Sequence, residues 1–298
     1  YDFEKVIKSS LDHAPNFKKY LETTFVNEED GSPDLEIIPF IQEMMGYYLI
    51  PNLNGGFVFF FIGGGANGKS VLSDVIGSFM GERFVTHMSI ETLTLDKFSG
   101  SNLVGKYLNI CNEEESKFMR SDKFKALVTG DPTTVEKKFG DKFELRPNVK
   151  FLFCSNLMPS FENINYGLIR RVKILPFFRR FAQEERDMGL LKKLREELPA
   201  IINFALEGAK RFIDRGYYFV DPTTIKHAAD EFECQSSSVI YYAREHLEWS
   251  KDRLNTTPNS LLYNSYRTWC DINGRKAVNA ANFGRELNVA FPSSKAIA

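Results

Sequence analysis

Short apolar runs alternate along this chain with segments in which apolar residues recur every three or four positions. The runs have the length of buried strands, and they lie at residues 57–62, 107–111, 149–154 and 172–175. The periodic segments predict helices, first over residues 37–48 and then directly after the first apolar run. Strands that alternate with helices predict an α/β fold with a mostly parallel sheet.

After the last of these runs the pattern becomes helical. Residues 190–212 carry Leu, Ile and Ala at helical spacing, with Gly216 as the stop signal. Two further helices are predicted around residues 261–269 and 281–287. Because 298 residues exceed a typical domain of about 100 to 200, we expect an α/β body with smaller helical attachments. We place the divisions at residues 1–50, 51–182, 183–250 and 251–298.

Charge is distributed unevenly, although the net charge of -1 gives no global basic signature. Residues 1–50 hold ten Asp and Glu against four Lys, so we do not place nucleic acid there. Residues 117–150 hold nine Lys and Arg against five Asp and Glu. Any contact with nucleic acid must therefore come from local clusters or from a channel built by several subunits.

The four cysteines lie far apart without metal-binding spacing, and we interpret them as reduced thiols of a cytoplasmic protein. No apolar run approaches the roughly 18 residues of a transmembrane helix, so we expect no membrane partner. The sequence begins at Tyr1 rather than Met. We therefore expect a piece of a longer polypeptide, with another activity upstream.

Residues 63–70 carry the pattern Gly-x4-Gly-Lys-Ser between a strand-like run and a predicted helix. Glycines let backbone N–H groups turn toward phosphate oxygens, and a helix N-terminus adds a favourable dipole. Lys69 would neutralise β- and γ-phosphate charge, and Ser70 would bind Mg²⁺. The residues predicted to bind ATP or GTP are Gly63, Gly65, Asn67, Gly68, Lys69, Ser70 and Val71. The alternative is a glycine-rich turn in which Lys-Ser occurs by chance.

Two of the apolar runs end in polar residues that suit nucleotide hydrolysis. The run at 107–111 precedes Asn112 and three glutamates, of which we assign Glu113 to polarise the attacking water and to share the Mg²⁺ ion. Three successive glutamates leave the register open, and a solvated acidic loop is the alternative. The run at 149–154 leads to Asn156, whose amide would bond the γ-phosphate and the lytic water. A strand exit of ordinary turn chemistry is the alternative there.

Two arginines, Arg170 and Arg171, stand just before the run at 172–175. A guanidinium delivered across a subunit boundary stabilises charge on a transferring phosphoryl group, an effect of about 10³ to 10⁵ in rate. The alternative for these residues is a pair of surface salt bridges.

Residues 133–146 read as a β-hairpin with a glycine-containing tip. Lys137, Lys138 and Lys142 near the tip would follow the backbone of single-stranded DNA. Phe139 and Phe143 would either stack on bases or pack the hairpin. We favour packing, because buried Phe is the usual case.

Together these motifs resemble the superfamily III helicases, specifically the helicase portion of phage, plasmid and poxvirus-type primase-helicases. The resemblance covers most of residues 15–270. Its motifs are residues 63–70 in the form Gly-x-Gly-x-Asn-Gly-Lys-Ser, Gly105-Lys106, Thr129-Gly130-Asp131, Ser155-Asn156-x-x-Pro159, and Arg170-Arg171 followed by Pro176-Phe177.

The resemblance implies an AAA+-like P-loop core with a helical N-terminal segment for oligomerisation or a collar. It also implies a C-terminal end that is helical and partly winged-helix-like, where Arg275, Lys276 or Arg285 would contact duplex DNA. The family forms rings, commonly hexamers, which hydrolyse ATP at subunit interfaces and move 3′ to 5′ on single-stranded DNA. A primase-polymerase domain can precede the helicase on one polypeptide, and such a phage- or mobile-element-encoded protein works in the host cytoplasm.

By position in the family pattern, Arg171 is the arginine finger, Asn156 the sensor and the hairpin lysines the DNA grip. Asn112 departs from the pattern, since many relatives carry an acid there. Mg²⁺ would then rest mainly on Ser70 and water, with Glu113 keeping the catalytic role.

Two other functions stay open from the sequence. A P-loop small-molecule kinase would use the same phosphate loop with a lid from its own chain and no oligomer. A nucleotide-dependent DNA-binding scaffold that does not hydrolyse would fit the weakened acidic motif at Asn112. The hairpin and the strand that ends at Asn156 favour the helicase over the kinase, and Glu113 favours it over the scaffold.

Overall fold

A computed structural model describes residues 11–27, 29–51, 53, 56–114, 118–158, 160–162, 166–248, 250 and 257–291. Its centre is a five-stranded sheet with the order β2-β3-β7-β1-β9, in which all neighbouring strands run parallel. The strands are β1 (Val58–Ile62), β2 (Val85–Thr86), β3 (Leu108–Cys111), β7 (Lys150–Ser155) and β9 (Val172–Pro176). The predicted α/β fold with a parallel sheet is therefore confirmed.

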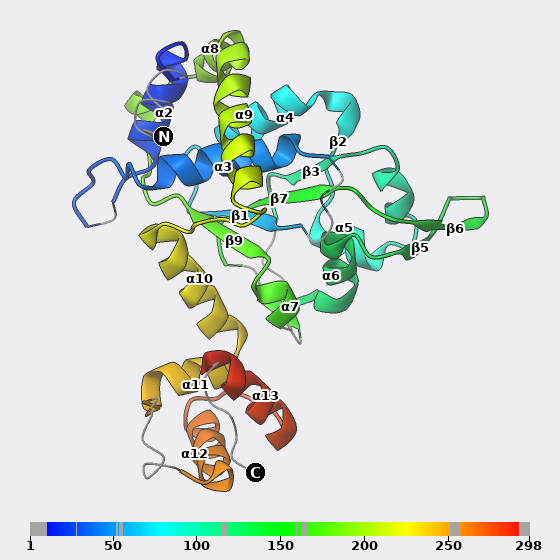
Figure 1. Ribbon diagram of the computed structural model, residues 1–298, viewed down its shortest axis with the longest axis vertical. Coiled ribbons are helices and arrows are strands. Elements are labelled where there is room, and N and C mark those ends of the chain that lie inside the picture. Colours follow the sequence, from blue (N-terminus) through cyan, green and yellow to red (C-terminus); the bar gives the residue numbers. More distant parts are fainter. Residues whose placement is uncertain are drawn as a thin grey trace.

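Helices cover both faces of the sheet (Figure 1). Successive side chains of a strand point to opposite faces, so Phe59 and Phe61 of β1 join one hydrophobic cluster, and Val58 and Phe60 join the other. The first face carries α2 (Pro15–Thr24), α3 (Ile37–Leu49), α4 (Lys69–Met80), α8 (Leu190–Glu196) and α9 (Leu198–Asp214). The second carries α5 (Ile90–Leu95), α6 (Ser121–Thr129), α7 (Tyr166–Ile169) and α10 (Thr223–Ser236).

The N-terminal segment is built into the main body rather than standing apart from it. Helix α3 crosses α9 so closely that a Cβ atom on Gly208 would lie 2.0 Å from the carbonyl oxygen of Gln42. Beside this crossing, buried Glu43 accepts hydrogen bonds from Arg211 at 3.0 Å and Arg215 at 2.7 Å. Part of the acidic charge of residues 1–50 is thus neutralised inside the fold. The role of this segment in oligomerisation stays a prediction.

Two small sheets flank the main one. Strands β4 (Phe118–Arg120) and β8 (Ser160–Glu162) pair in parallel. Strands β5 (Thr133–Glu136) and β6 (Lys142–Leu145) form the predicted antiparallel hairpin, which projects away from the body (Figure 1). Three short 3-10 helices complete the body, η1 (Glu82–Phe84), η2 (Ser99–Leu103) and η3 (Gln183–Glu185).

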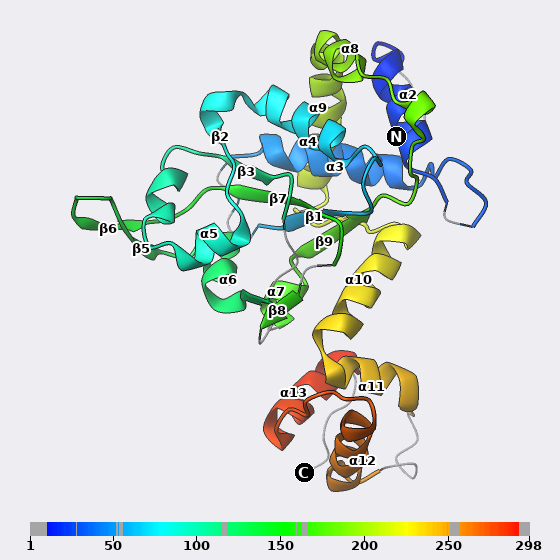
Figure 2. The ribbon, with the colours of Figure 1, turned by 180° about the vertical axis from the view of Figure 1, so that it is seen from behind.

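The C-terminal end forms its own small helical cluster, joined to the body through α10 (Figure 2). It comprises α11 (Ser238–His246), α12 (Asn259–Ile272) and α13 (Ala280–Ala290), packed around Tyr266, Cys270 and Phe283. The Asn279 side chain accepts a hydrogen bond from the backbone of Asn282 and caps α13. The two predicted helices are confirmed, and the described part of residues 257–291 contains no strand.

One detail differs from the sequence pattern. The predicted helix over 190–212 is two helices, separated at Glu197, whose carboxylate accepts hydrogen bonds from the backbone N–H groups of Asn16 and Phe17. Pro199 lies in the first turn of α9, where its missing N–H costs nothing.

All four cysteines are free. In the part of the chain that the structure describes, no helix is long and apolar enough to cross a membrane.

Candidate functional site

The glycine-rich loop of residues 63–70 connects β1, the strand between β7 and β9, to the N-terminus of α4. Gly68 has φ +89°, a conformation that favours glycine, and it precedes the first helical residue, Lys69. Gly63 has no room for a side chain, because a Cβ atom there would lie 2.4 Å from the carbonyl oxygen of Phe177. Gly64 and Gly65 have open space around the Cβ position, so the loop keeps an accessible side.

The ammonium group of Lys69 lies inside this loop. It donates hydrogen bonds to the carbonyl oxygens of Gly63 and Gly64 and to the side-chain oxygen of Asn67, the latter two at 3.0 and 3.1 Å. Burial lowers the pKa of Lys69, since desolvation disfavours the charged form. A cation held among oxygen acceptors at the mouth of a loop is suited to an anionic ligand with several oxygens, such as a triphosphate. Ser70 is exposed and Val71 half-buried in the next positions of α4.

The strand next to β1 brings the predicted sensor to Lys69. Asn156 directly follows β7, and its side-chain oxygen lies 3.5 Å from the Lys69 ammonium. These two residues are separated by eighty-seven positions in the chain. The structure therefore brings the end of β7 next to the loop, while the roles of the two residues stay predictions.

The three glutamates after β3 were the candidates among which the sequence left the choice open. Glu114 is buried, and its carboxylate accepts a hydrogen bond of 2.9 Å from the backbone of Ile90 at the start of α5. Glu113 is exposed beside it. Glu115 lies outside the described residues. Of these two residues Glu113 is the exposed one, and its role in polarising water stays a prediction.

Asn112 is exposed, and its side chain contacts residues of helix α4. Its side-chain oxygen accepts a hydrogen bond of 2.7 Å from the Ser73 hydroxyl, and its amide group lies 3.5 Å from the Asp74 carboxylate. Burial raises the pKa of that carboxylate. Asp74 stands one helical turn after Ser70, and the sequence analysis did not single it out. The spacing of four residues on a helix was the signal that could have found it.

The chain that leaves β9 binds the outside of the loop. The backbone N–H of Phe177 donates to Ile62 at 2.7 Å, and that of Phe181 donates to Ala66 at 2.9 Å. Helix α2 also reaches the loop, because the Tyr20 hydroxyl donates to the Gly68 carbonyl at 3.0 Å. These contacts were missed by sequence reasoning, which used Phe177 only as a family marker.

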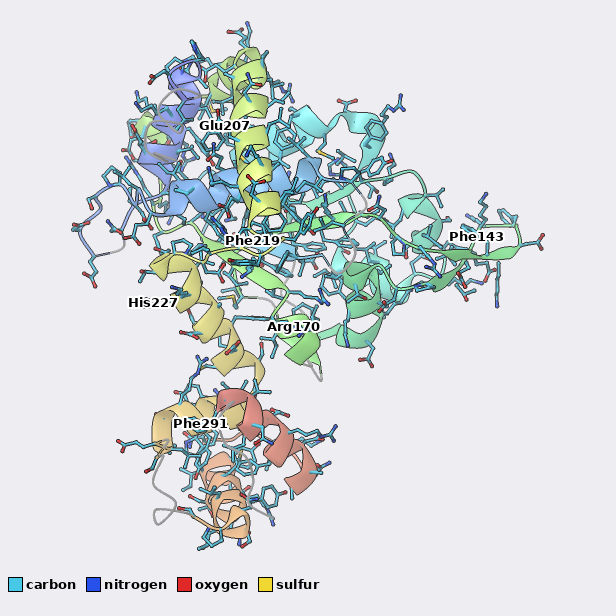
Figure 3. All side chains as sticks on the ribbon, viewed as in Figure 1. Phe143, Arg170, Glu207, Phe219, His227 and Phe291 are labelled. Carbon is cyan, nitrogen blue, oxygen red and sulfur yellow. The ribbon has the colours of Figure 1, made fainter. Side chains whose placement is uncertain are left out.

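The two arginines lie at the other end of the sheet. Val172 of β9 aligns with Val58 of β1, and Pro176 aligns with Ile62 next to the loop. Five residues of strand, about 16 Å, therefore separate Arg170 and Arg171 from the loop of the same chain. Arg170 is exposed in the turn before β9 (Figure 3). Arg171 is half-buried, and burial together with Arg170 lowers its pKa.

The hairpin tip carries exposed basic and aromatic side chains. Lys137, Lys138 and Lys142 are all exposed, and the Lys137 ammonium lies 5.5 Å from the centre of the Phe143 ring. Phe139 is 97% exposed, so the prediction that it packs the hairpin is wrong. Its φ of +62° marks the turn of the tip, which directs the ring outward because a two-stranded hairpin has no core of its own to receive it.

The basic residues of the C-terminal cluster are in part engaged within it. The Arg275 guanidinium lies 4.7 Å from the centre of the Tyr241 ring and 5.6 Å from that of Trp269. Lys276 and Arg285 are both exposed. Duplex binding by these residues stays a prediction, and Arg275 has a packing role as well.

Comparison with known protein sequences identifies viral relatives. Residues 61–171 match DUF5906, described as a family of unknown function, and this stretch contains the loop, Glu113, the hairpin and Asn156. The chain is 30% identical over 139 residues to the uncoating factor OPG117 of vaccinia virus, covering 43% of this chain and 18% of that protein. It is 29% identical over 146 residues to "Putative helicase L207/L206" of Acanthamoeba polyphaga mimivirus, covering 46% and 15%. It is 26% identical over 161 residues to primase D5 of fowlpox virus, covering 49% and 20%.

Comparison with solved structures agrees with this result at the level of the fold. The A-form apo structure of the NrS-1 C-terminal region aligns with a TM-score of 0.55 at 15% sequence identity, covering 77% of this chain and 53% of that one. The chain thus spans about half of the solved structure and no more than a fifth of each viral relative. Its homologues are viral D5-type proteins named for primase, helicase or uncoating functions, and it shares its fold with the NrS-1 C-terminal region.

Proposed function

We propose that this chain is the ATP-driven motor of a DNA helicase or translocase that acts in the replication of a virus, phage or plasmid. One observation carries the proposal. The loop of residues 63–70, the exposed Glu113 and Asn156 lie at the carboxyl ends of β1, β3 and β7, which are close neighbours in the sheet. In open parallel sheets, ligands bind at the carboxyl ends of the strands.

The residues at this edge divide the chemistry of ATP hydrolysis between them. Lys69 would exchange the loop carbonyls for phosphate oxygens, which are better partners for a cation. Ser70 and Glu113 would hold a Mg²⁺ ion, which neutralises charge on the β- and γ-phosphates. Glu113 would orient and deprotonate water, and Asn156, already 3.5 Å from Lys69, would report whether the γ-phosphate is present.

The position of the arginines supports the proposal of a ring of subunits. A guanidinium reaches only about half of the 16 Å that separates the start of β9 from the loop, so Arg170 or Arg171 cannot act on a nucleotide bound to its own chain. A head-to-tail arrangement would bring them to the loop of the next subunit. We therefore propose an AAA+-like, superfamily III ring, a hexamer in the family pattern, with ATP hydrolysed between subunits.

Single-stranded DNA is the proposed track. The hairpin presents three exposed lysines and an exposed aromatic ring on one projecting tip, which suits a phosphate backbone with unpaired bases. Movement from 3′ to 5′ and an upstream primase-polymerase domain complete the proposal, and both rest on the family resemblance.

A complementation experiment tests the proposal. ATPase is measured with and without single-stranded DNA for the wild type, Lys69→Ala, Arg170→Ala and Arg171→Ala, with Lys192→Ala, an exposed residue of α8, as control. We expect DNA-stimulated turnover, loss by about 10³-fold or more in Lys69→Ala and in one arginine variant, and no loss in the control. Mixing these two inactive variants in equal amounts should restore turnover at about a quarter of the interfaces. An active interface needs a subunit with intact Lys69 next to a subunit with the intact arginine, in that order.

Two other outcomes favour the alternatives. A small-molecule kinase would hydrolyse or transfer phosphate as a monomer, and its inactive variants would show no rescue on mixing. A scaffold would bind ATP in the wild type and never turn it over. The resemblance names the half-buried Arg171 as the arginine finger, and the exposed Arg170 is the other candidate. The mixing experiment assigns the finger to one of them.

A further inference from the structure

The phosphate loop is bordered on one side by the chain that leaves β9, which we call the strap and define as residues 177–181. It is fastened to the loop at three points. Two are the backbone hydrogen bonds from Phe177 to Ile62 and from Phe181 to Ala66, and the third is the Asn67 amide, which donates to the Phe177 carbonyl at 3.4 Å. The absence of a side chain at Gly63 permits this close approach. The strap is therefore a fixed wall of the candidate nucleotide site.

The order of the strands decides which end of a nucleotide meets this wall. Asn156 and Glu113 follow β7 and β3, which lie on one side of β1, whereas the strap follows β9 on the other side. If the γ-phosphate points to Asn156 and Glu113, as hydrolysis requires, the rest of the nucleotide extends away from β7. The nucleoside then lies on the β9 side, where the strap borders the loop.

The strap carries two exposed side chains. Phe177 is buried against Phe25 and Phe61, and Arg179 donates to the Thr23 carbonyl at 3.0 Å, so both are held against the body. Phe178, 44% exposed, and Arg180, also exposed, alternate with them along the strap. An aromatic ring and a planar guanidinium two residues apart are the groups that stack on nucleic acid bases.

We infer that the strap is the base-binding wall of the site, with Phe178 and Arg180 stacking on the purine ring of a nucleoside triphosphate. This inference rests on the proposed function, since it needs a triphosphate in the loop. Stacking recognises the flat face of a base rather than the hydrogen-bonding pattern of its edge. ATP and GTP should therefore depend on these two side chains alike.

The test compares nucleotides with inorganic tripolyphosphate, which carries the phosphates without a nucleoside. Dissociation constants are measured by calorimetry with Mg²⁺ for the wild type, Phe178→Ala and Arg180→Ala. The matched controls are Tyr218→Ala and Arg267→Ala, which remove an exposed aromatic ring and an exposed arginine elsewhere. All four positions are exposed, and thermal unfolding checks that each variant folds.

We expect Phe178→Ala to weaken ATP and GTP binding by about 5- to 100-fold, Arg180→Ala by a similar or smaller factor, and neither to change tripolyphosphate binding. The controls should bind all three ligands like the wild type. Suppose that the wild type binds nucleotides and tripolyphosphate, but both strap variants leave nucleotide affinity unchanged or lower it no more than tripolyphosphate affinity. This result would contradict the role of the strap in base binding and leave the proposed nucleotide site intact. If the wild type binds none of the three ligands, the proposed function falls, and this inference with it.

Discussion

Replacing Gly208 with alanine should destabilise the body of this protein, although alanine is the better helix former. A Cβ atom at Gly208 would lie 2.0 Å from the carbonyl oxygen of Gln42 and 2.7 Å from the backbone nitrogen of Glu43. These are backbone atoms of α3, so no side chain can rotate away, and α3 must move from α9 by about 1.5 Å to reach ordinary contact distances.

The magnitude follows from two opposing effects. Overpacking of this kind costs about 3 kcal/mol, and the higher helix propensity of alanine returns about 1 kcal/mol. We therefore expect the free energy of unfolding to fall by about 2 kcal/mol, which lowers the thermal midpoint by roughly 4 to 8 °C. Separation of the helices would also strain the bonds from Arg211 to Glu43, so the loss can be larger but not smaller.

The measurement is urea or thermal unfolding followed by circular dichroism, with Gly284→Ala as the control. Gly284 lies within α13 and has nothing within 4 Å of its Cβ position, so the same substitution should be neutral or stabilise by up to about 1 kcal/mol. A Gly208→Ala protein as stable as the wild type would refute the view that the glycine is required by the approach of α3 and α9.

Four further predictions concern single side chains. Burial lowers the pKa of Lys150 to about 7, against about 10.4 in an unfolded chain. Between these values the unfolded state binds the proton and the folded state does not, so the free energy of unfolding should rise from pH 7 to pH 10. Unfolding midpoints of the wild type and Lys150→Met measure this, and an equal pH slope in both proteins would contradict it. Glu113→Gln should abolish ATP turnover and keep ATP binding, as turnover assays would show. Glu114→Ala should lower the free energy of unfolding by about 1 kcal/mol, because it loses its hydrogen bond to the start of α5, and chemical denaturation measures this change. Phe139→Ala should weaken single-stranded DNA binding by about 5-fold or more in a fluorescence titration at fixed salt, with unchanged stability; unchanged affinity would assign the ring no part in DNA contact.

Much of the fold was predictable because its signals are local. The buried runs of β1, β3, β7 and β9, the glycine loop and the helix after it depend on residues near one another in sequence, and all lie where the pattern predicted. The hairpin was predicted for the same reason. The exposure of Phe139 was not predicted, because burial depends on whether another element covers the hairpin tip. The residue type alone does not indicate whether such a covering element is present.

The candidate site, too, was predictable only where its signals are local in the sequence. The sequence gives no order for the strands, so it could not show that Asn156 reaches Lys69. Nor could it show that the strap borders the loop while the arginines lie at the opposite end of β9. Nor could it choose between neighbouring glutamates, since Glu113 and Glu114 differ only in what surrounds them: solvent for the first and the start of α5 for the second.

By itself, then, the amino-acid sequence determined the elements, the parallel α/β character and the phosphate loop, because hydrophobic period and glycine spacing act over a few residues. Only the tertiary structure decided which distant residues meet. It placed Arg170 and Arg171 a strand's length from their own loop, brought α3 and α9 together at Gly208, and fastened the strap to Ala66. These contacts join positions far apart in the chain, and their geometry is set by packing around the sheet rather than by any local preference.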